Sequence, residues 1–193
     1  NLECDTPQNA TISSLDFSFC EGETVSLEAN ADNLSESASY TYAWYLGSIS
    51  NDNLMESKTD NNTYSTDIEG TYYVVVSNQQ DPNSCFDNSP SVIVVADESP
   101  TASVESSNPA GICEGESVTL SSNATGSNLT YIWSNGESSP NIIVSSGGNY
   151  TVNVISSATG CDVTSLLSLD ENSNPVLALP DSIRFCQDDS LEI

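Results

Sequence analysis

One stretch of sequence occurs two and a fraction times in this chain of 193 residues, and this repetition constrains the fold more than any other feature. The clearest copy runs from Cys113 to Cys161 with the pattern C-x-G-x-x-V-x-L, Y-x-W, G-x-Y-x-V-x-V and a closing cysteine. Another copy runs from Cys20 to Cys85, and a third begins at Cys186. We call Cys20, Cys113 and Cys186 the opener cysteines, and Cys85 and Cys161 the late cysteines.

A proline precedes each copy, at Pro7, Pro100 and Pro175, and marks where one repeat gives way to the next. We therefore predict repeat 1 at residues 1–98, repeat 2 at 99–173 and the start of repeat 3 at 174–193. The connecting stretches 97–100 and 170–175 are short, and proline restricts the residue before it, so we expect domains stacked end to end. The third copy stops after eight residues of the pattern, and we expect the chain to be part of a longer protein.

Apolar and polar residues alternate within each repeat, which is typical of half-buried strands. The predicted strands lie at residues 10–15, 23–29, 40–46, 64–68, 71–77, 91–96, 102–105, 117–123, 129–134, 141–145, 149–156 and 163–169. Residues 51–62 are predicted to be a polar loop inserted in repeat 1. Such strands, with a tryptophan on the third, predict an all-β fold of tandem immunoglobulin-like β-sandwich domains. The predicted core includes Trp44, Trp133, Tyr72 and Tyr150.

The chain carries 28 acidic residues against two basic ones and has no histidine. Nothing in it can neutralise phosphates, so nucleic acid and anionic membrane surfaces are excluded as partners. The absence of histidine removes histidine-based acid–base catalysis and histidine ligation of metals. Pairs of carboxylates fall in turns and linkers rather than in a cleft, so no catalytic residue is predicted and the chain is not expected to be an enzyme. We interpret the charge as an adaptation to a saline exterior.

The repeat pattern resembles the Ig-like repeats of very long secreted proteins of Bacteroidetes, including gliding-motility adhesins of the SprB type and other proteins exported by the type IX system. The resemblance covers both complete repeats and the third start. It implies a structural or adhesive stalk or filament, extracellular and at the cell surface, without insertion into the membrane. The implied partners are neighbouring repeats, surface polysaccharide and other cells. Such repeats also accompany enzymes, so the alternative is a spacer or glycan-binding module of an extracellular polysaccharide-degrading enzyme.

The cysteines lie outside the strands that antibody domains join with a disulfide. An opener cysteine precedes the second strand and a late cysteine follows the sixth, and these strands run the same way. The two cysteines of one repeat should then lie about 20 Å apart or more, at opposite poles. A disulfide spans only about 7 Å between Cα atoms. We therefore favour Cys20–Cys161 between repeats.

In the favoured scheme Cys4 pairs with Cys85, while Cys113 and Cys186 bond repeats outside this chain. The scheme within repeats, Cys20–Cys85 and Cys113–Cys161, stays open because paired cysteines within a domain usually bond each other.

Two further kinds of site are candidates. Acidic pairs at the repeat junctions offer hard oxygen ligands for Ca²⁺, although the sequence has no EF-hand loop; these are Asp97, Glu98, Asp170 and Glu171. Ser182 and Ser190 each follow an aspartate and precede an apolar residue, a pattern that resembles Bacteroidetes O-glycosylation sites. No cofactor other than Ca²⁺ is expected.

Overall fold

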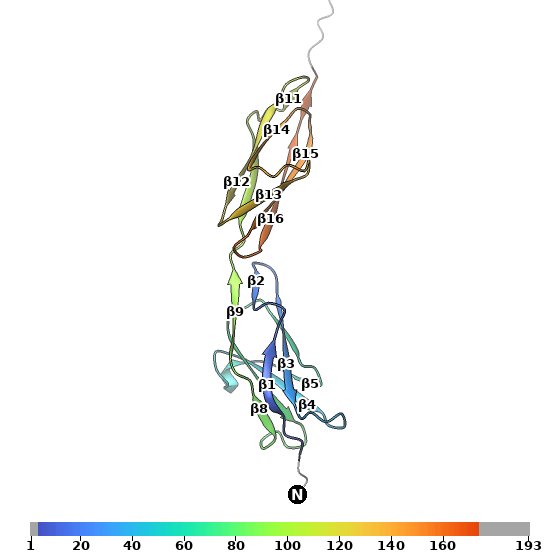
Figure 1. The fold of residues 1–193 in the computed structure, drawn as a ribbon, viewed down its shortest axis with the longest axis vertical. Coiled ribbons are helices and arrows are strands. Elements are labelled where there is room, and N and C mark those ends of the chain that lie inside the picture. The colour runs from blue at the N-terminus through green and yellow to red at the C-terminus, as the bar shows by residue number, and fades with distance from the viewer. Residues whose placement is uncertain (1–3, 174–193) are drawn as a thin grey trace, which may run out of the picture. The chain divides into compact units, whose positions relative to one another are not determined.

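A computed structural model describes residues 4–173 of the chain, and these residues form an all-β structure (Figure 1). The one helical element in the described range is a single 3-10 turn, η1 (Asn51–Asn53). The start of repeat 3, with Cys186, Ser182 and Ser190, lies outside the described residues.

Backbone contacts divide the chain into two compact units. Unit 1 contains the chain up to Thr101 together with Thr125–Thr130 and Val154–Val163. Among the described residues, unit 2 contains Ala102–Ala124, Tyr131–Asn153 and residues 164–173. Two short segments of sequence repeat 2 therefore belong to unit 1, and one of them carries Cys161.

Repeat 1 folds into two sheets. The strands are β1 (Gln8–Ser13), β2 (Ser18–Cys20), β3 (Val25–Asp32), β4 (Tyr40–Leu46), β5 (Leu54–Thr59), β6 (Thr63–Thr66), β7 (Gly70–Asn78), β8 (Phe86–Asn88) and β9 (Val92–Asp97). One sheet has the order β1-β3-β6, and the other has the order β2-β9-β7-β4-β5 with β8 added to β7. The sheet of β1, β3 and β6 thus faces the sheet that contains β4, β7 and β9. This pairing of the first, second and fifth main strands against the third, sixth and seventh is an immunoglobulin-like arrangement.

The core of this sandwich follows from the alternation in its strands. Val25, Leu27 and Ala29 point inward from β3 and are buried, while the residues between them are exposed. Trp44 on β4 is fully buried and stacks on Tyr64, with 5.7 Å between ring centroids. Fully burying a large apolar side chain stabilises a fold by about 1.5–3 kcal/mol, so this inward face contributes most of what holds the two sheets together.

Repeat 2 has a similar arrangement with fewer strands, since its described residues contain no counterpart of β5 or β8. Its strands are β10 (Thr101–Ser106), β11 (Ile112–Cys113), β12 (Val118–Thr125), β13 (Leu129–Trp133), β14 (Asn141–Val144), β15 (Gly148–Ser156), β16 (Asp162–Leu169) and β17 (Glu171–Asn172). They form sheets β10-β12-β14 and β13-β15-β16 and a short parallel pair, β11-β17. The prediction of an all-β, immunoglobulin-like fold is confirmed. The end-to-end stacking of such domains stays a prediction.

Two predicted loops form strands instead. The polar insertion 51–62 contains η1 and then β5, which pairs antiparallel with β4 and extends that sheet. Its side chains are exposed or half-buried, so the stretch lacks the apolar alternation by which a strand is recognised. The predicted linker at 170–175 contains β17, whose pairing with β11 is backbone-driven and equally invisible in the side-chain pattern. Leu15, predicted in the first strand, lies beyond β1 and is fully exposed.

The tyrosine of the G-x-Y motif makes the same hydrogen bond in both repeats. Tyr72 donates its hydroxyl to the Ile68 carbonyl oxygen at 2.8 Å, and Tyr150 donates to the Ser146 carbonyl oxygen at 2.9 Å. Such a bond to backbone a few residues upstream resembles the tyrosine corner of immunoglobulin-like sandwiches. Burial raises the pKa of Tyr72, and its hydrogen bond with Thr66 opposes part of that rise.

Three of the four predicted core aromatics, Trp44, Trp133 and Tyr72, are buried, but Tyr150 is only half-buried. The β-sheet register supplies the reason. Tyr64, whose ring lies 6.1 Å from that of Tyr72, is replaced in repeat 2 by the smaller Ile142. The prediction of Tyr150 as a core residue is therefore corrected to the edge of the core.

Candidate functional site

The opener cysteine of repeat 1 is held at the end of a short parallel strand. Strand β2 pairs with the end of β9, and its register places Cys20 opposite Asp97. The neighbouring Phe19 is buried in the core and anchors the strand. A tight turn follows, in which the Glu23 amide donates to the Cys20 carbonyl oxygen at 2.9 Å and Gly22 has φ of 85°. Glycine adopts that backbone conformation without steric cost, so the turn presents Cys20 at the pole of the sandwich.

The late cysteine of repeat 2 follows strand β15. The chain turns back after Ser156, whose amide donates to the Cys161 carbonyl oxygen at 2.8 Å, while the Gly160 amide donates to the Ser156 carbonyl oxygen at 2.7 Å. Cys161 is 1% exposed and forms a disulfide with Cys20, with 5.6 Å between their Cα atoms. Both residues lie within unit 1, and the distance is in the usual range for a disulfide.

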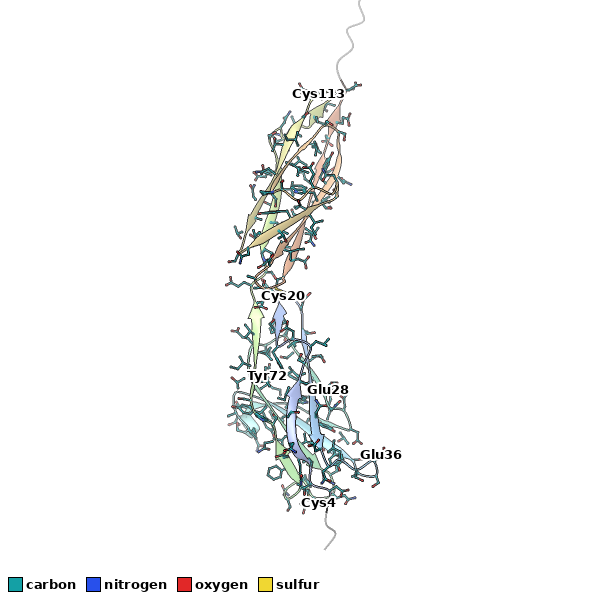
Figure 2. All side chains as sticks on the ribbon, in the orientation of Figure 1. Cys4, Cys20, Glu28, Glu36, Tyr72 and Cys113 are labelled. Carbon is teal, nitrogen blue, oxygen red and sulfur yellow. A yellow bond between two sulfur atoms is a disulfide. The ribbon has the colours of Figure 1, made fainter. Side chains whose placement is uncertain are left out.

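A second disulfide joins Cys4 to Cys85, with 6.4 Å between Cα atoms. Strands β9 and β7 run antiparallel, so their C-terminal ends lie at opposite ends of the sheet. Cys20 on β2 is paired with the C-terminal end of β9, whereas Cys85 follows the C-terminal end of β7. The two cysteines of repeat 1 therefore lie at opposite ends of unit 1, where Figure 2 shows Cys20 at one end and Cys4, the partner of Cys85, at the other. The structure has both bonds of the favoured scheme, and the alternative pair Cys20–Cys85 does not form because of this separation.

A buried polar residue ends β7 in repeat 1 and β15 in repeat 2, and each one hydrogen-bonds a nearby connecting segment. The sequence analysis did not identify these two residues. Asn78 is 1% exposed, donates its side-chain amide to the Asp5 carbonyl oxygen at 3.2 Å and accepts from the Gln80 amide at 2.9 Å. In repeat 2 the buried Ser156 donates to the Ser127 carbonyl oxygen at 3.1 Å. The signal is a polar residue at an inward position of each strand, directly before the turn.

The opener cysteine of repeat 2 occupies the same kind of position as that of repeat 1. Cys113 ends the short strand β11, which pairs in parallel with β17 and places Cys113 opposite Asn172. The residue before it, Ile112, is fully buried, as Phe19 is before Cys20. Cys113 is half-buried and has no disulfide partner among residues 4–173. Its bond to a further repeat stays a prediction, as does that of Cys186, which lies outside the described residues.

The predicted Ca²⁺ ligands do not converge. Asp97 and Glu98 lie at the end of β9, and Asp170 and Glu171 precede and begin β17. The Glu171 carboxylate instead accepts a hydrogen bond from the Gly147 amide at 2.8 Å. No cluster of three or more metal-ligating side chains is found in the part of the chain that the structure describes. The four residues thus remain separate acidic groups, and a Ca²⁺ site built from them stays a prediction.

The surface carries its negative charge almost without cationic partners. Within residues 4–173 the one ion pair joins Lys58 to Glu56 on β5 at 2.9 Å, and both side chains are about one-third exposed. A surface depression of about 600 Å³ beside β1 and β3 is lined by hydroxyl groups, by the carboxylates of Asp16 and Glu28, and by the apolar side chains of Leu15 and Val25. It contains no aromatic ring on which a sugar would stack.

The arrangement is suited to covalent cross-linking. Disulfides of this kind form and persist in oxidising surroundings, so the chain has the character of an extracellular or secreted domain. Among the described residues, no helix has the length and apolar character needed to cross a membrane.

No protein-family model matches the chain, and no curated protein matches it. Among solved structures, murine CEACAM1b is similar over 85% of this chain and 100% of its own, with 18% identity and a TM-score of 0.42. The human OSCAR ligand-binding domain covers 85% of this chain and 100% of its own, at 12% identity and a TM-score of 0.38. Three N-terminal domains of the bacteriophage RB49 outer capsid protein Hoc cover 83% of this chain and 59% of theirs, at 19% identity and a TM-score of 0.37. With TM-scores below 0.5, these similarities do not show what the chain binds.

Proposed function

We propose that this chain is a stalk segment of a long secreted protein displayed at the cell surface, where disulfides join successive repeats and carry mechanical load. The observation that supports the proposal is the Cys20–Cys161 disulfide, whose cysteines belong to different sequence repeats and lie 141 positions apart. A bond of this kind places a covalent link in parallel with the peptide chain. Tension on the chain then passes through the sulfur–sulfur bond and not through the peptide chain between Cys20 and Cys161.

The equivalent placement of Cys113 extends this joint to further repeats. Cys20 and Cys113 each end a two- or three-residue strand in parallel register with the last strand of their own repeat. We propose that Cys113 bonds the late cysteine of repeat 3, and that Cys186 does the same with the repeat after it. One rule, opener cysteine of one repeat to late cysteine of the next, then builds a continuous stalk.

The acidic surface supports an extended stalk. Like charges at this density repel within and between chains, which keeps a protein soluble and disfavours lateral association. At physiological or marine salt concentration, repulsion between charges further apart than about 8 Å is largely screened, so the repulsion acts between near neighbours. The proposed setting is an adhesin at the cell surface, of the gliding-motility kind that the repeat pattern resembles.

The test is made in the source organism, where serine replaces Cys20 and Cys161 in the chromosomal copy. Antibodies raised against residues 4–173 measure the amount of protein on unpermeabilised cells. Adhesion to glass is then measured as the shear stress at which half the cells detach. We expect equal surface labelling and detachment at lower shear in the variant.

Unchanged detachment with equal labelling contradicts the load-bearing role. Retention of the purified chain on an insoluble polysaccharide, in binding assays run alongside, favours the glycan-binding alternative over the stalk. A chain that neither labels the cell surface nor changes adhesion argues against both.

A further inference from the structure

The two late cysteines occupy equivalent places but bond to different partners. The amide of the last residue of strand β7, Asn78, donates to the Cys85 carbonyl oxygen at 2.9 Å, and the amide of Ser156, which ends β15, donates to that of Cys161 at 2.8 Å. Both cysteines are buried, at 4% and 1% exposure. Cys161 bonds the opener cysteine Cys20, whereas Cys85 bonds Cys4, which is not an opener cysteine.

The residues in front of the opening prolines explain this difference. Cys4 lies three positions before Pro7, as Asp97 lies three positions before Pro100. The residue after each accepts a hydrogen bond, at its carbonyl oxygen, from a side chain that shortly precedes the late cysteine. Asn78 donates to Asp5 at 3.2 Å, and Thr159 donates to Glu98 at 3.4 Å.

A late cysteine therefore lies beside two positions. The Cys161 sulfur is bonded to Cys20 and also lies 3.9 Å from the Asp97 carbonyl oxygen. Cys20 and Asp97 are direct neighbours in the register of β2 and β9. Cys20 and Asp97 are therefore the two positions beside the late cysteine, and in front of repeat 1 the position equivalent to Asp97 is the one that holds a cysteine.

We propose that the Cys4–Cys85 disulfide is a cap that closes repeat 1 to the covalent joint made elsewhere by an opener cysteine. This inference rests on the proposed stalk function and gives the stalk a direction. The end of repeat 1 that holds Cys85 cannot be bonded by the opener cysteine of any other repeat, whatever precedes residue 1 in a longer protein. The end of repeat 2 that holds Cys113 keeps its opener cysteine available within residues 4–173.

Removing the cap should convert the closed end into an acceptor. In a Cys4→Ser variant Cys85 is left as a thiol, and its natural partner is the Cys113 thiol of a second copy of this chain. Each pair of thiols gives up two protons and two electrons to oxidised glutathione, which is reduced to two molecules of glutathione as the Cys85–Cys113 bond forms. Because the contact is head-to-tail, it can repeat from one copy to the next and gives a series of oligomers of increasing size.

The experiment compares three full-length chains, all with Cys186→Ser so that Cys186 does not compete. They are the background chain, Cys4→Ser, and Cys4→Ser with Cys113→Ser. Each is incubated with oxidised glutathione in 1 M NaCl, where charges are screened beyond about 3 Å. Non-reducing gels and peptide maps then identify the cross-links. We expect a ladder with Cys85–Cys113 bonds from Cys4→Ser alone, and no cross-link through Cys85 in the other two chains.

The cap is overturned if Cys85 of the folded Cys4→Ser chain stays a thiol, or if it bonds Cys85 of another copy as often as Cys113. Because the loss of Cys4 could unfold repeat 1, circular dichroism is recorded and a second variant keeps Cys4. This second variant combines Cys20→Ser with Asp97→Cys. If Cys20 and Asp97 both lie beside the late cysteine, the cysteine introduced at position 97 should bond Cys161 of the same chain. A free Cys161 in that folded variant overturns it. The stalk function itself fails separately, if the wild-type map lacks Cys20–Cys161.

Discussion

The covalent connectivity makes a quantitative prediction for the length of this protein under force. A load applied between the two chain ends follows the shortest covalent path through the described residues. In the wild type that path runs from Cys4 along 16 residues to Cys20 and then across the disulfide to Cys161. At about 3.5 Å per residue, this part of the chain extends to roughly 56 Å even when both repeats are unfolded.

Replacing Cys20 and Cys161 by serine changes the path. The load now crosses from Cys4 to Cys85 and follows the 76 residues from there to position 161. The path is 60 residues longer, so the fully unfolded variant should extend about 210 Å further than the wild type. Optical tweezers with handles at both ends measure this gain as the difference in contour length after the last unfolding event.

The other disulfide supplies a matched control. Replacing Cys4 and Cys85 by serine leaves the path through 16 residues and the Cys20–Cys161 bond intact, so the extended length should equal that of the wild type. Equal contour lengths for all three chains refute the assignment of Cys20–Cys161 as the bond that carries load. A gain in the control and none in the Cys20/Cys161 variant refutes the connectivity itself.

Three further predictions concern stability. Tyr72→Phe should lower the free energy of unfolding by about 1–3 kcal/mol in chemical denaturation, because it leaves the Ile68 carbonyl oxygen without its donor and the buried Thr66 hydroxyl without its partner. Tyr150→Phe should lower it by under about 1 kcal/mol, because water reaches that half-buried site, and equal losses for the two variants contradict this account. Because burial raises the pKa of Tyr72, the unfolded state releases this proton first, so stability should fall as pH rises above about 10, toward the folded-state pKa. Below pH 10 the contribution of Tyr72 to the free energy of unfolding is fully present. Tyr72→Phe should make the loss of stability above pH 10 less steep, and an unchanged dependence of stability on pH contradicts a role for Tyr72. Raising NaCl from 0.1 M to 1 M should raise the melting temperature by about 4–8 °C for each kcal/mol of charge repulsion that the salt screens. A melting temperature that stays constant or falls with added NaCl contradicts destabilisation by self-repulsion.

The side-chain pattern was sufficient for the strands that build the core. The alternation in β3, β4 and β7 is the direct imprint of one face turned inward, so Trp44, Leu27 and Val74 could be assigned to the interior without coordinates. The opposite placement of Cys20 and Cys85 also followed from strand direction alone. The short strands β2, β8, β11 and β17 could not be found in this way, because backbone pairing defines them and their two or three residues show no period.

The sequence by itself determined the repeat, the fold class, the charge and the positions of the cysteines, because each is a property of local pattern. The tertiary structure decided which sulfur meets which. Cys161 reaches both Cys20 and the backbone of Asp97 because β2 and β9 lie in parallel register, a relation between residues 77 positions apart. No local signal carries that register. The half-buried state of Tyr150 also depends on the tertiary structure, because the register puts the smaller Ile142 on β14 where repeat 1 has Tyr64 on β6.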